Sequence, residues 1–324
     1  MAQLFGPLMV LVFCLSQAFR DVYFAGLFQG VDFFAVIVIV FGISTLIFGG
    51  LTVARARDEL ARLRAESGTV VAMNLSTALA WTCYFFALTH LEPSIVNTIH
   101  SGMAPLTVVA LGALGAPLAQ QGKVGRGEGL CYGGIALAIV ALWWVVLTGR
   151  SGLGHDDFST SLMGLGFVLC SGTSITVSLL YSKRLHDRGI SAEAVTAVRY
   201  PLTVTLAACI FLMAGRPAGI ASPGQFLVIA AAGTILIVLP TFALQVGVAR
   251  TAPLTAQIIR ALGPVCVFAL EPFDHRLSYR AATLVPILAY SAFAIAGNLL
   301  HGWIPGAAHG AAKVPPGPRV RAAR

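Results

Sequence analysis

Long apolar stretches separated by short polar turns make up most of the chain. Each stretch has roughly 20 residues, the length at which a helix crosses the hydrocarbon core of a bilayer. The stretches lie at about residues 4–28, 31–54, 69–91, 93–116, 128–148, 160–182, 191–214, 222–247, 252–273 and 280–302. Breaker residues such as Gly30 and the Glu92-Pro93 pair stand between them. The pattern therefore predicts an all-α membrane protein with ten transmembrane helices.

Two polar segments, one in each half of the chain, resemble each other. A shift of 160 residues aligns Pro93 with Pro253, Asn97 with Gln257, and His100 with Arg260. The polar residues of each segment are three positions apart, so they lie on one face of their helix. We interpret the similarity as an internal duplication, in which residues 1–150 form one five-helix repeat and residues 151–303 form the other.

The charge distribution gives this duplication an orientation. Because the first repeat has an odd number of helices, the second repeat must enter the membrane upside down. With the N-terminus inside, 14 Lys and Arg residues fall on the inner side and 5, Arg20 among them, on the outer side. Positive residues favour cytoplasmic loops, so we expect both termini in the cytoplasm of a bacterial-type inner (plasma) membrane. Residues 304–324 have the composition of a disordered cytoplasmic tail.

Composition supports the membrane assignment and argues against several other classes. Hydrophobic residues make up 57% of the chain and charged residues 10%, whereas soluble domains have about 25% charged residues. The net charge of +8 comes largely from loops that set topology, so we expect no nucleic-acid partner. The six cysteines form no Cys-x-x-Cys pair, which argues against disulfides or a metal site. The sequence has no phosphate-binding or hydrolase motif, and we expect no cofactor.

Short motifs within the apolar stretches resemble one transporter family. They are Ala-Leu-Thr-His-Leu-Glu-Pro-Ser at 87–94, Pro105, Gly133-Gly134, Ala197-Val-Arg199, Gly263-Pro264 and Leu270-Glu271. Together with the five-plus-five plan, they resemble the drug/metabolite transporter superfamily, EamA type, over residues 4–302. The chain departs from that pattern by lacking a basic residue in its second apolar stretch and an acidic residue at the end of its fourth. The resemblance implies a secondary transporter that exports a small organic metabolite or drug.

Four polar residues of the duplicated segments are the first candidates for a substrate site: Asn97, His100, Gln257 and Arg260. At 1.5 Å per residue, His100 and Arg260 lie about 10 Å from the starts of their helices, near the middle of the bilayer core. An arginine at this depth costs at least about 2.5 kcal/mol unless it faces a cavity or a partner. We expect the four side chains to line a central cavity and bind substrate, with Arg260 on an anionic group. The alternative is that they only join helices by hydrogen bonds.

Two aromatic residues three positions apart, Trp81 and Tyr84, are further substrate-binding candidates. Their rings could stack on an aromatic or cationic substrate, and apolar packing is the alternative explanation. Arg199 lies about 12 Å into its predicted helix. We expect its long stem to carry the charge to the inner headgroups.

Two prolines and several small residues indicate where helices bend or approach one another. Pro105 and Pro264 each remove a backbone hydrogen bond within a predicted helix, so they serve either as hinges or as static kinks. The hydroxyl-rich stretch at residues 171–178 is expected to allow close helix packing. Gly129 and Gly133 form a small-xxx-small pair, which is consistent with a helix contact or a homodimer.

These observations leave three functions to compare. The first is a secondary transporter that carries a small molecule across the lipid bilayer by alternating access, since inverted repeats are typical of such carriers. The second is an intramembrane enzyme, or a membrane subunit of an enzyme, that uses His100 as a base. The sequence offers no second polar partner for His100 at the same depth. The third is a channel, which the mid-helix prolines and the lack of a continuous polar stripe disfavour.

Overall fold

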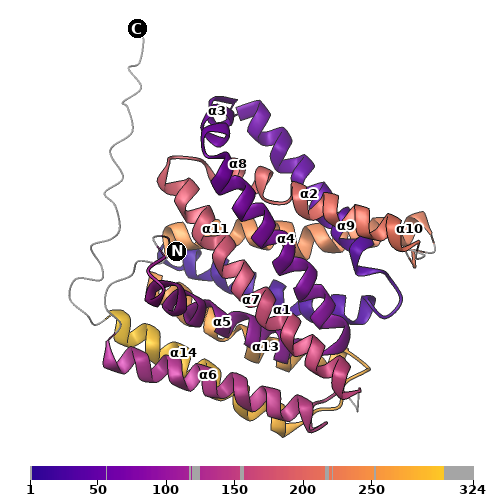
Figure 1. Cartoon of the computed structure of the whole chain (residues 1–324), viewed down its shortest axis with the longest axis vertical. Helices are drawn as coiled ribbons and strands as arrows, with labels where there is room; N and C mark the ends of the chain where they lie inside the picture. The colour runs from indigo at the N-terminus through magenta and orange to yellow at the C-terminus, as the bar shows by residue number, and fades with distance from the viewer. Residues whose placement is uncertain are drawn as a thin grey trace.

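The computed structural model of the chain is a bundle of helices that cross one another in several directions (Figure 1). It describes residues 2–55, 57–116, 118, 125–153, 157–215, 219–220, 222–251 and 253–302. Within these residues there is no β-strand. The predicted tail at 304–324 lies outside them. The prediction of an all-helical protein is thus confirmed for the described chain.

Ten helical segments of the described chain are long and apolar enough to span a membrane. They coincide with the ten stretches predicted from hydrophobicity. The five of the first half are uninterrupted, namely α1 (Ala2–Leu27), α2 (Phe33–Arg55), α4 (Ser67–His90), α5 (Pro93–Ala113) and α6 (Arg126–Leu147). Local capping explains two of the boundaries. Asp32 accepts the backbone N–H of Phe34 at 2.8 Å before α2, and Pro93 stands in the first turn of α5.

The second half differs, because three of its five described spans are interrupted. Only α7 (Phe158–Asp187) and α14 (Ala281–Gly302) run without a break. The other three are α8 (Ala192–Arg199) with α9 (Pro201–Ala214), α10 (Pro223–Gly233) with η2 (Thr234–Val238) and α11 (Leu239–Arg250), and α12 (Pro253–Ala261) with α13 (Gly263–Leu270) and η3 (Glu271–Phe273). The helices predicted at 191–214 and 252–273 are thus present as spans that contain a short break, and the one predicted at 222–247 contains a π-helical turn.

A proline explains each interruption. Pro201, Pro240 and Pro264 each stand at the start of the piece that follows a break. Proline has no N–H to donate to the preceding turn, and its ring collides with the carbonyl four residues back. Near Pro240 the chain adopts a π-helical turn, and at the other two positions the helix ends and restarts.

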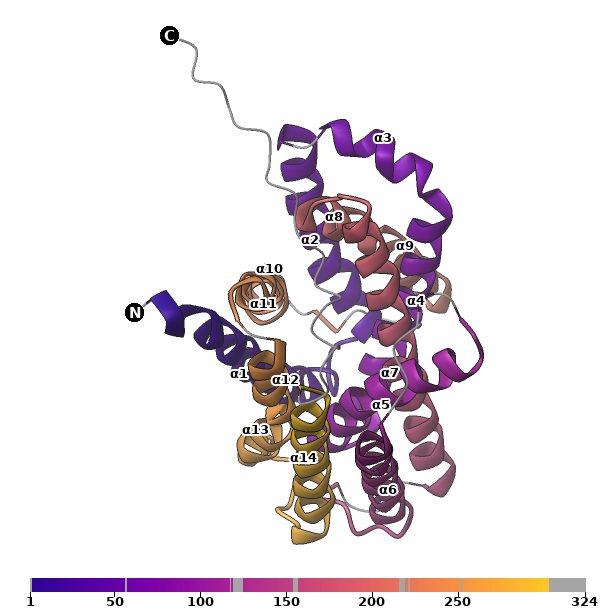
Figure 2. The same ribbon diagram turned by 90° about the vertical axis from the view of Figure 1, so that its left-hand side faces the viewer.

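The two halves of the chain pack against each other along most of their length. In the first half, α4 and α5 contact α7, while α1 contacts α11, α12 and α13. α2 lies against both α8 and α9, and α6 lies beside α14, as both ribbon views show (Figures 1 and 2). Helices from the two halves therefore interleave around a common core.

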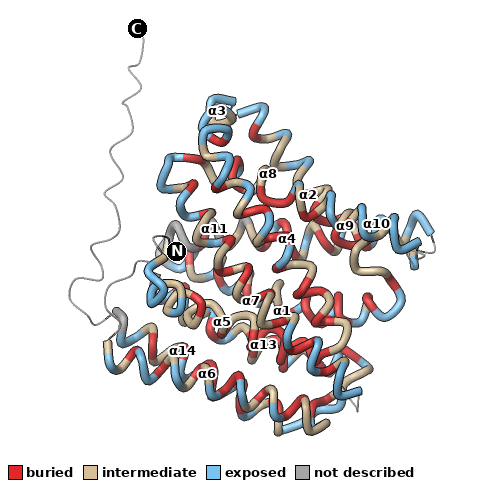
Figure 3. The backbone as a smooth tube through the Cα atoms, in the orientation of Figure 1, coloured by how far each residue is buried: buried red, intermediate tan, exposed pale blue. Residues whose placement is uncertain are grey.

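The core is rich in aromatic side chains where α1, α2 and α4 meet. Phe24, Phe41 and Phe85 are each fully buried there. The ring centroid of Phe41 lies 4.8 Å from that of Trp81, and the Phe28 centroid lies 5.0 Å from that of Phe85. Figure 3 shows buried positions concentrated in the middle of the bundle. This apolar packing surrounds the polar residues described below.

Small residues set the contact between α6 and α14. A Cβ atom placed at Gly134 would lie 2.5 Å from the Phe293 ring, and one at Gly297 would lie 3.2 Å from Cys131. By contrast, no atom lies within 4 Å of a Cβ placed at Gly129 or Gly133. Gly134 therefore makes the close helix approach within the chain. The homodimer suggested by the Gly129 and Gly133 face stays a prediction.

One short helix was not predicted. The loop after α2 contains α3 (Arg57–Ala65), whose buried Leu63 packs with Met73, Leu185 and Ile190. Glu59 accepts both the backbone N–H and the hydroxyl of Ser191 at 2.8 Å each, and so caps the start of α8. This loop therefore covers the turn between α7 and α8 and joins the two halves at that end.

Candidate functional site

A buried ion pair in α1 lies at the centre of the polar side chains. Arg20 is 7% exposed and Asp21 is fully buried. The Arg20 Nη2 atom lies 2.6 Å from Asp21 Oδ1, and its Nε donates to the same oxygen at 2.8 Å. The sequence predicts Arg20 among the basic residues of the outer side, and the structure shows that its side chain is buried within the bundle. Because both charges are buried, each depends on the other for compensation.

The Arg20 guanidinium lies close to the two aromatic candidates of α4. Its Cζ atom is 5.3 Å from the ring centroid of Trp81 and 5.3 Å from that of Tyr84. Its Nη2 also donates to the Tyr84 hydroxyl at 3.3 Å. These are distances for a cation–π interaction. Tyr84 is 1% exposed, whereas Trp81 is half-buried, and the buried Trp81 Nε1 has no hydrogen-bond partner among the described residues.

Asn97 belongs to the same network. Its Nδ2 donates to Asp21 Oδ2 at 2.7 Å, and its side chain is buried, with 1% of the residue exposed. Its Oδ1 faces Gly263, where it lies 3.8 Å from the position of an added Cβ. Asn97 therefore connects the carboxylate of α1 with the restart of the interrupted helix at α13. This placement makes it a support of the ion pair.

His100 bridges α5 to α7 and α4. Its Nδ1 lies 3.0 Å from Ser171 Oγ, and the Ser171 hydroxyl donates to the Ala80 carbonyl at 2.8 Å. A serine hydroxyl has a single hydrogen, so Nδ1 must be the donor to Ser171 and Nε2 is left as the free acceptor. The imidazole also stands edge-on to Tyr84, with ring centroids 4.7 Å apart. The hydrogen bond from Ser171 to Ala80 joins α7 to α4, as expected for a hydroxyl-rich stretch at 171–178 that allows close helix packing.

Gln257 and Arg260 are both exposed on α12. No carboxylate of the described chain lies within ion-pair distance of Arg260. The guanidinium lies within electrostatic range of His100 of α5, Cys14 of α1 and Tyr290 of α14. An unpaired cation within a membrane-spanning segment requires water or an anion to compensate it.

The structure brings most of the predicted candidates into one region. Trp81, Tyr84, Asn97 and His100 meet around Arg20 and Asp21, and Arg260 is an electrostatic neighbour of His100. Gln257 lies on the exposed face of α12, and no hydrogen bond of the described residues joins it to the cluster. Sequence reasoning missed Arg20 and Asp21. The available signal was a pair of adjacent opposite charges within the apolar stretch at 4–28.

The two candidate hinges have different surroundings. Pro105 lies inside the uninterrupted helix α5, whereas Pro264 stands at the start of α13, directly after the break at Leu262. The two prolines therefore differ in local geometry, and the hinge role of each stays a prediction. Pro264 lies next to Gly263, which faces Asn97, so the break in the second half borders the polar cluster.

Arg199 is not directed to the headgroups, contrary to the prediction. It is 9% exposed, its Nη2 donates to Ser178 Oγ at 3.3 Å, and its Cζ lies 5.9 Å from the Tyr200 ring centroid. Ser178 in turn shares a 2.6 Å hydrogen bond with Thr77. Arg199 ends α8, where the C-terminal carbonyls of the helix favour a positive charge. The residue therefore stabilises the break before Pro201.

Metal and thiol chemistry have no visible site in the described chain. No group of three or more His, Cys, Asp or Glu side chains within it could hold a metal ion. All six cysteines are free thiols there, and three of them, Cys14, Cys83 and Cys131, are buried. The polar cluster is thus built from an ion pair, amide and imidazole groups, and aromatic rings.

Comparison with known proteins bears on the fold alone. No family model and no curated protein matches the chain. The chain is similar to a solved structure described only as "Crystal structure of protein", with a TM-score of 0.61 and 18% sequence identity. The similarity covers 92% of this chain and 96% of that one. This protein is therefore similar in fold, over nearly its whole length, to a chain already seen in a crystal.

Proposed function

We propose that the chain is a secondary transporter that moves a small organic metabolite or drug across the plasma membrane. Transport would proceed by alternating access between inverted repeats at 1–150 and 151–303, with both termini in the cytoplasm. The substrate binds at Arg260 and His100, beside Trp81. The resemblance of the 87–94 motif and its companions to EamA-type drug/metabolite transporters supports export as the direction.

The observation that carries the proposal is the position of Arg260. An exposed guanidinium, about 10 Å into a membrane-spanning segment, acts on groups of α1, α5 and α14. A membrane protein tolerates such a charge where it faces a water-filled cavity or a ligand. The planar guanidinium is suited to a carboxylate, which it can bind through two parallel hydrogen bonds. We therefore expect a substrate that carries an anionic group.

The pairing of the helices supports inverted repeats. A two-fold relation between the repeats exchanges each span with the span five positions away. It maps the contact of α4 (span three) with α7 (span six) onto that of α11 (span eight) with α1 (span one). The contact of α5 with α7 corresponds in the same way to that of α12 and α13 with α1. The same two-fold relation maps the contact of α2 with α8 and α9 onto itself. It does the same for the contact of α6 with α14. Random packing of ten helices would not favour this correspondence.

Interrupted helices also support a carrier. In transporters built from inverted repeats, broken helices near the middle of the membrane surround the substrate and coupling-ion sites. The break between α12 and α13 borders Asn97 and stands two residues after Arg260. The pieces on either side of the break can move as separate units.

The geometry of His100 disfavours the enzyme alternative. The hydroxyl that it contacts by a hydrogen bond, that of Ser171, is fully buried and directs its hydrogen to the Ala80 carbonyl. Ser171 therefore accepts from His100 and does not offer it a proton, so the pair lacks the nucleophile–base geometry of hydrolases. A channel is tested directly by the experiment below.

Counterflow in liposomes tests the proposal. A stability screen of the purified protein with amino acids, nucleosides, organic acids and cationic drugs identifies a ligand, because binding raises the melting temperature by mass action. Proteoliposomes loaded with that ligand should take up labelled ligand faster than empty ones. A channel would show no such trans-stimulation, and equal uptake by loaded and empty vesicles would reject the carrier.

A further inference from the structure

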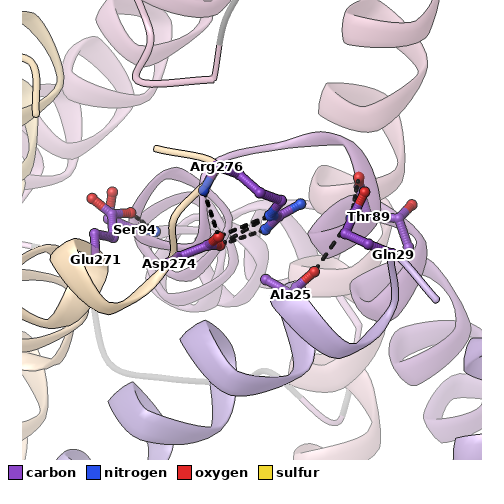
Figure 4. A network of polar contacts seen from close by, with 7 residues as sticks. All are labelled: Ala25, Gln29, Thr89, Ser94, Glu271, Asp274 and Arg276. Carbon is purple, nitrogen blue, oxygen red and sulfur yellow. Dashed lines mark hydrogen bonds and ion pairs between the residues drawn. The ribbon is translucent and has the colours of Figure 1, made fainter. Parts of the chain in front are cut away.

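Two buried glutamates meet where α5 begins and α13 ends. Glu92 is 2% exposed and directly precedes α5, and Glu271 is 3% exposed and follows α13. Ser94 joins them. Its backbone N–H donates to Glu271 Oε1 at 2.9 Å (Figure 4), and its hydroxyl lies 3.5 Å from Glu92 Oε1. Because the same serine binds both carboxyl groups, the two groups lie close together.

Other elements of both halves converge on Glu92. The backbone N–H of Gly152, in the connection between α6 and α7, donates to Glu92 Oε2 at 2.7 Å. The Thr283 hydroxyl of α14 donates to the same oxygen at 3.3 Å. Ser278 then donates from its N–H to the Gly152 carbonyl at 3.0 Å. The carboxyl pair thus joins α5, α13, α14 and the loop between the two halves.

No lysine or arginine of the described chain compensates the pair. The nearby arginine, Arg276, is engaged with Asp274, to which its Nη2 lies at 2.6 Å (Figure 4). The ion pairs of the described lysines and arginines include neither Glu92 nor Glu271. Two carboxylates cannot both be charged at contact in a buried position without such a partner. A carboxylate is only an acceptor, so direct contact requires a proton on one of the two groups.

A cavity beside Glu92 has room for water. A cavity of about 140 Å³ is lined by Glu92 together with His90, Ser151, Phe158 and Ser161. Each water molecule needs about 30 Å³, so the cavity has room for a few. It lies beside the pair on the side of α4 and α7, where it offers a path for a proton.

We propose that Glu92 and Glu271 share one proton, and that this proton holds the end of α13 to the start of α5. In the protonated pair, one carboxyl O–H donates to an oxygen of the other. When the proton leaves to solvent through the cavity, two adjacent carboxylates repel and the contact between the halves opens. This inference rests on the proposed function, because it makes the proton the ion that controls one gate of the carrier.

The burial of Glu92, which lies between two membrane spans, supports the shared proton. Burial raises the pKa of Glu92 above its usual value, and hydrogen bonds from Gly152, Thr283 and Ser94 oppose the rise only in part. A carboxyl whose pKa is higher in the folded than in the unfolded protein stabilises the fold at low pH. That stabilisation is lost as the pH rises through the folded value.

Other titratable groups surround the pair and must be separated from it in any pH experiment. On the described elements packed around it they are His90, Arg150, Asp157, Asp274, His275, Arg276, Tyr279 and Arg280. Of these, His90 lines the same cavity. Histidine is the residue type whose charge most often changes near neutral pH, so His90 is the main competing explanation for a transition there.

The melting temperature of the purified full-length protein in detergent tests the proposal without requiring transport. For the wild type it should fall as the pH rises from about 5 to about 9, because the shared proton is lost. Glu271→Gln should lose most of this dependence, since the amide N–H replaces the shared proton as the donor to Glu92. Glu92→Gln should behave in the same way. Infrared spectra should contain a protonated-carboxyl band that disappears at high pH in the wild type and is absent from both variants.

Three controls make the outcome decisive. Glu193→Gln, at an exposed glutamate of α8, and His90→Gln should both keep the wild-type pH dependence. If His90→Gln removes it, the histidine is the titrating group and the proposal is overturned. A rise in wild-type melting temperature with sodium at constant pH, lost in Glu271→Gln, would identify a cation site and also overturn it. The melting temperature can depend on pH in this way even if the protein shows no counterflow. The shared-proton proposal and the carrier proposal can therefore be rejected independently.

Discussion

Asn74 accepts a hydrogen bond from the backbone N–H of Leu202 at 3.2 Å, across the boundary between α4 and α9. The same amide donates through its Nδ2 to the carbonyl of Val198. In an uninterrupted helix, the Leu202 N–H would donate to that very carbonyl, four residues earlier. The Asn74 side chain therefore takes the place of one helical hydrogen bond, and it satisfies two of the backbone groups that the break before Pro201 sets free.

We predict that Asn74→Ala destabilises the protein through these two groups. Each buried backbone group left without a partner costs about 1–3 kcal/mol, so the melting temperature should fall clearly. Asn298→Ala is the matched control, because Asn298 donates only to the Ala294 carbonyl of its own helix. Thermal unfolding followed by tryptophan fluorescence compares the two. Equal losses for both variants would mean that Asn74 is not a special support of the break.

The Arg20–Asp21 pair gives a second prediction about stability. Asp21→Ala leaves Arg20 as a buried charge without compensation, and breaking a buried pair in this way costs about 3–5 kcal/mol. Replacement of both residues by apolar ones, Arg20→Met with Asp21→Leu, should destabilise less than Asp21→Ala alone. A double-mutant cycle of melting temperatures checks this. A double variant as unstable as the sum of its single variants would show that the two charges do not depend on each other.

The ten spans could be predicted from the sequence because each is long and almost uncharged. The interruptions could not, since a proline within an apolar stretch is equally compatible with a kinked helix such as α5 and a restarted one such as α13. Tertiary contacts decide between them. Asn74, from a distant helix, supplies the hydrogen bonds that make the break before Pro201 stable.

The candidate site was predictable only in part for a similar reason. Depth in the membrane singled out Asn97, His100 and Arg260, because polar groups there are costly. Arg20 and Asp21 lie near the end of their stretch, where charges commonly belong to a loop, and only the packing of α1 against α4 and α5 shows that they are buried. Partners on different helices have no signature in local sequence.

We predict that Pro264→Ala slows transport more than Pro105→Ala. An alanine at 264 can donate its N–H to the Arg260 carbonyl, four residues earlier, and so join α12 and α13 into one helix. Pro105 lies in a helix that is already continuous, so its replacement should straighten a static kink. Initial rates of counterflow, compared at equal melting temperature and expression, check the difference. Equal rates in wild type and Pro264→Ala would show that the break plays no part in transport.

The membrane orientation can be tested with single cysteines in a variant that lacks the native thiols. Cysteines at Arg64 and Arg188, both exposed, should react with a membrane-impermeant maleimide only after cells are opened. Cysteines at the exposed positions Arg150 and Tyr279 should react in intact cells. This follows from the bias of 14 to 5 in Lys and Arg, which increases further because Arg20 is buried in α1. Two of the four positions on the wrong side would reject the inverted-repeat topology.

Arg260 gives the sharpest prediction about substrate. Lysine at this position keeps the positive charge but loses the planar group that binds a carboxylate through two hydrogen bonds. Arg260→Lys should therefore fold and insert normally, lose most transport, and have a raised KM for a carboxylate-bearing substrate. Arg64→Lys, at an exposed arginine of α3, is the matched control and should transport at the wild-type rate.

Two measurements separate recognition of the substrate from a structural role of Arg260. If Arg260 binds substrate, ligand-induced stabilisation should be lost in Arg260→Lys while the melting temperature without ligand stays the same, since no described carboxylate pairs with this arginine. If the arginine is structural, the melting temperature without ligand should fall and the affinity should stay unchanged. Unchanged affinity and rate would instead place recognition at the half-buried Trp81, whose indole N–H is the remaining unpaired donor beside Arg20.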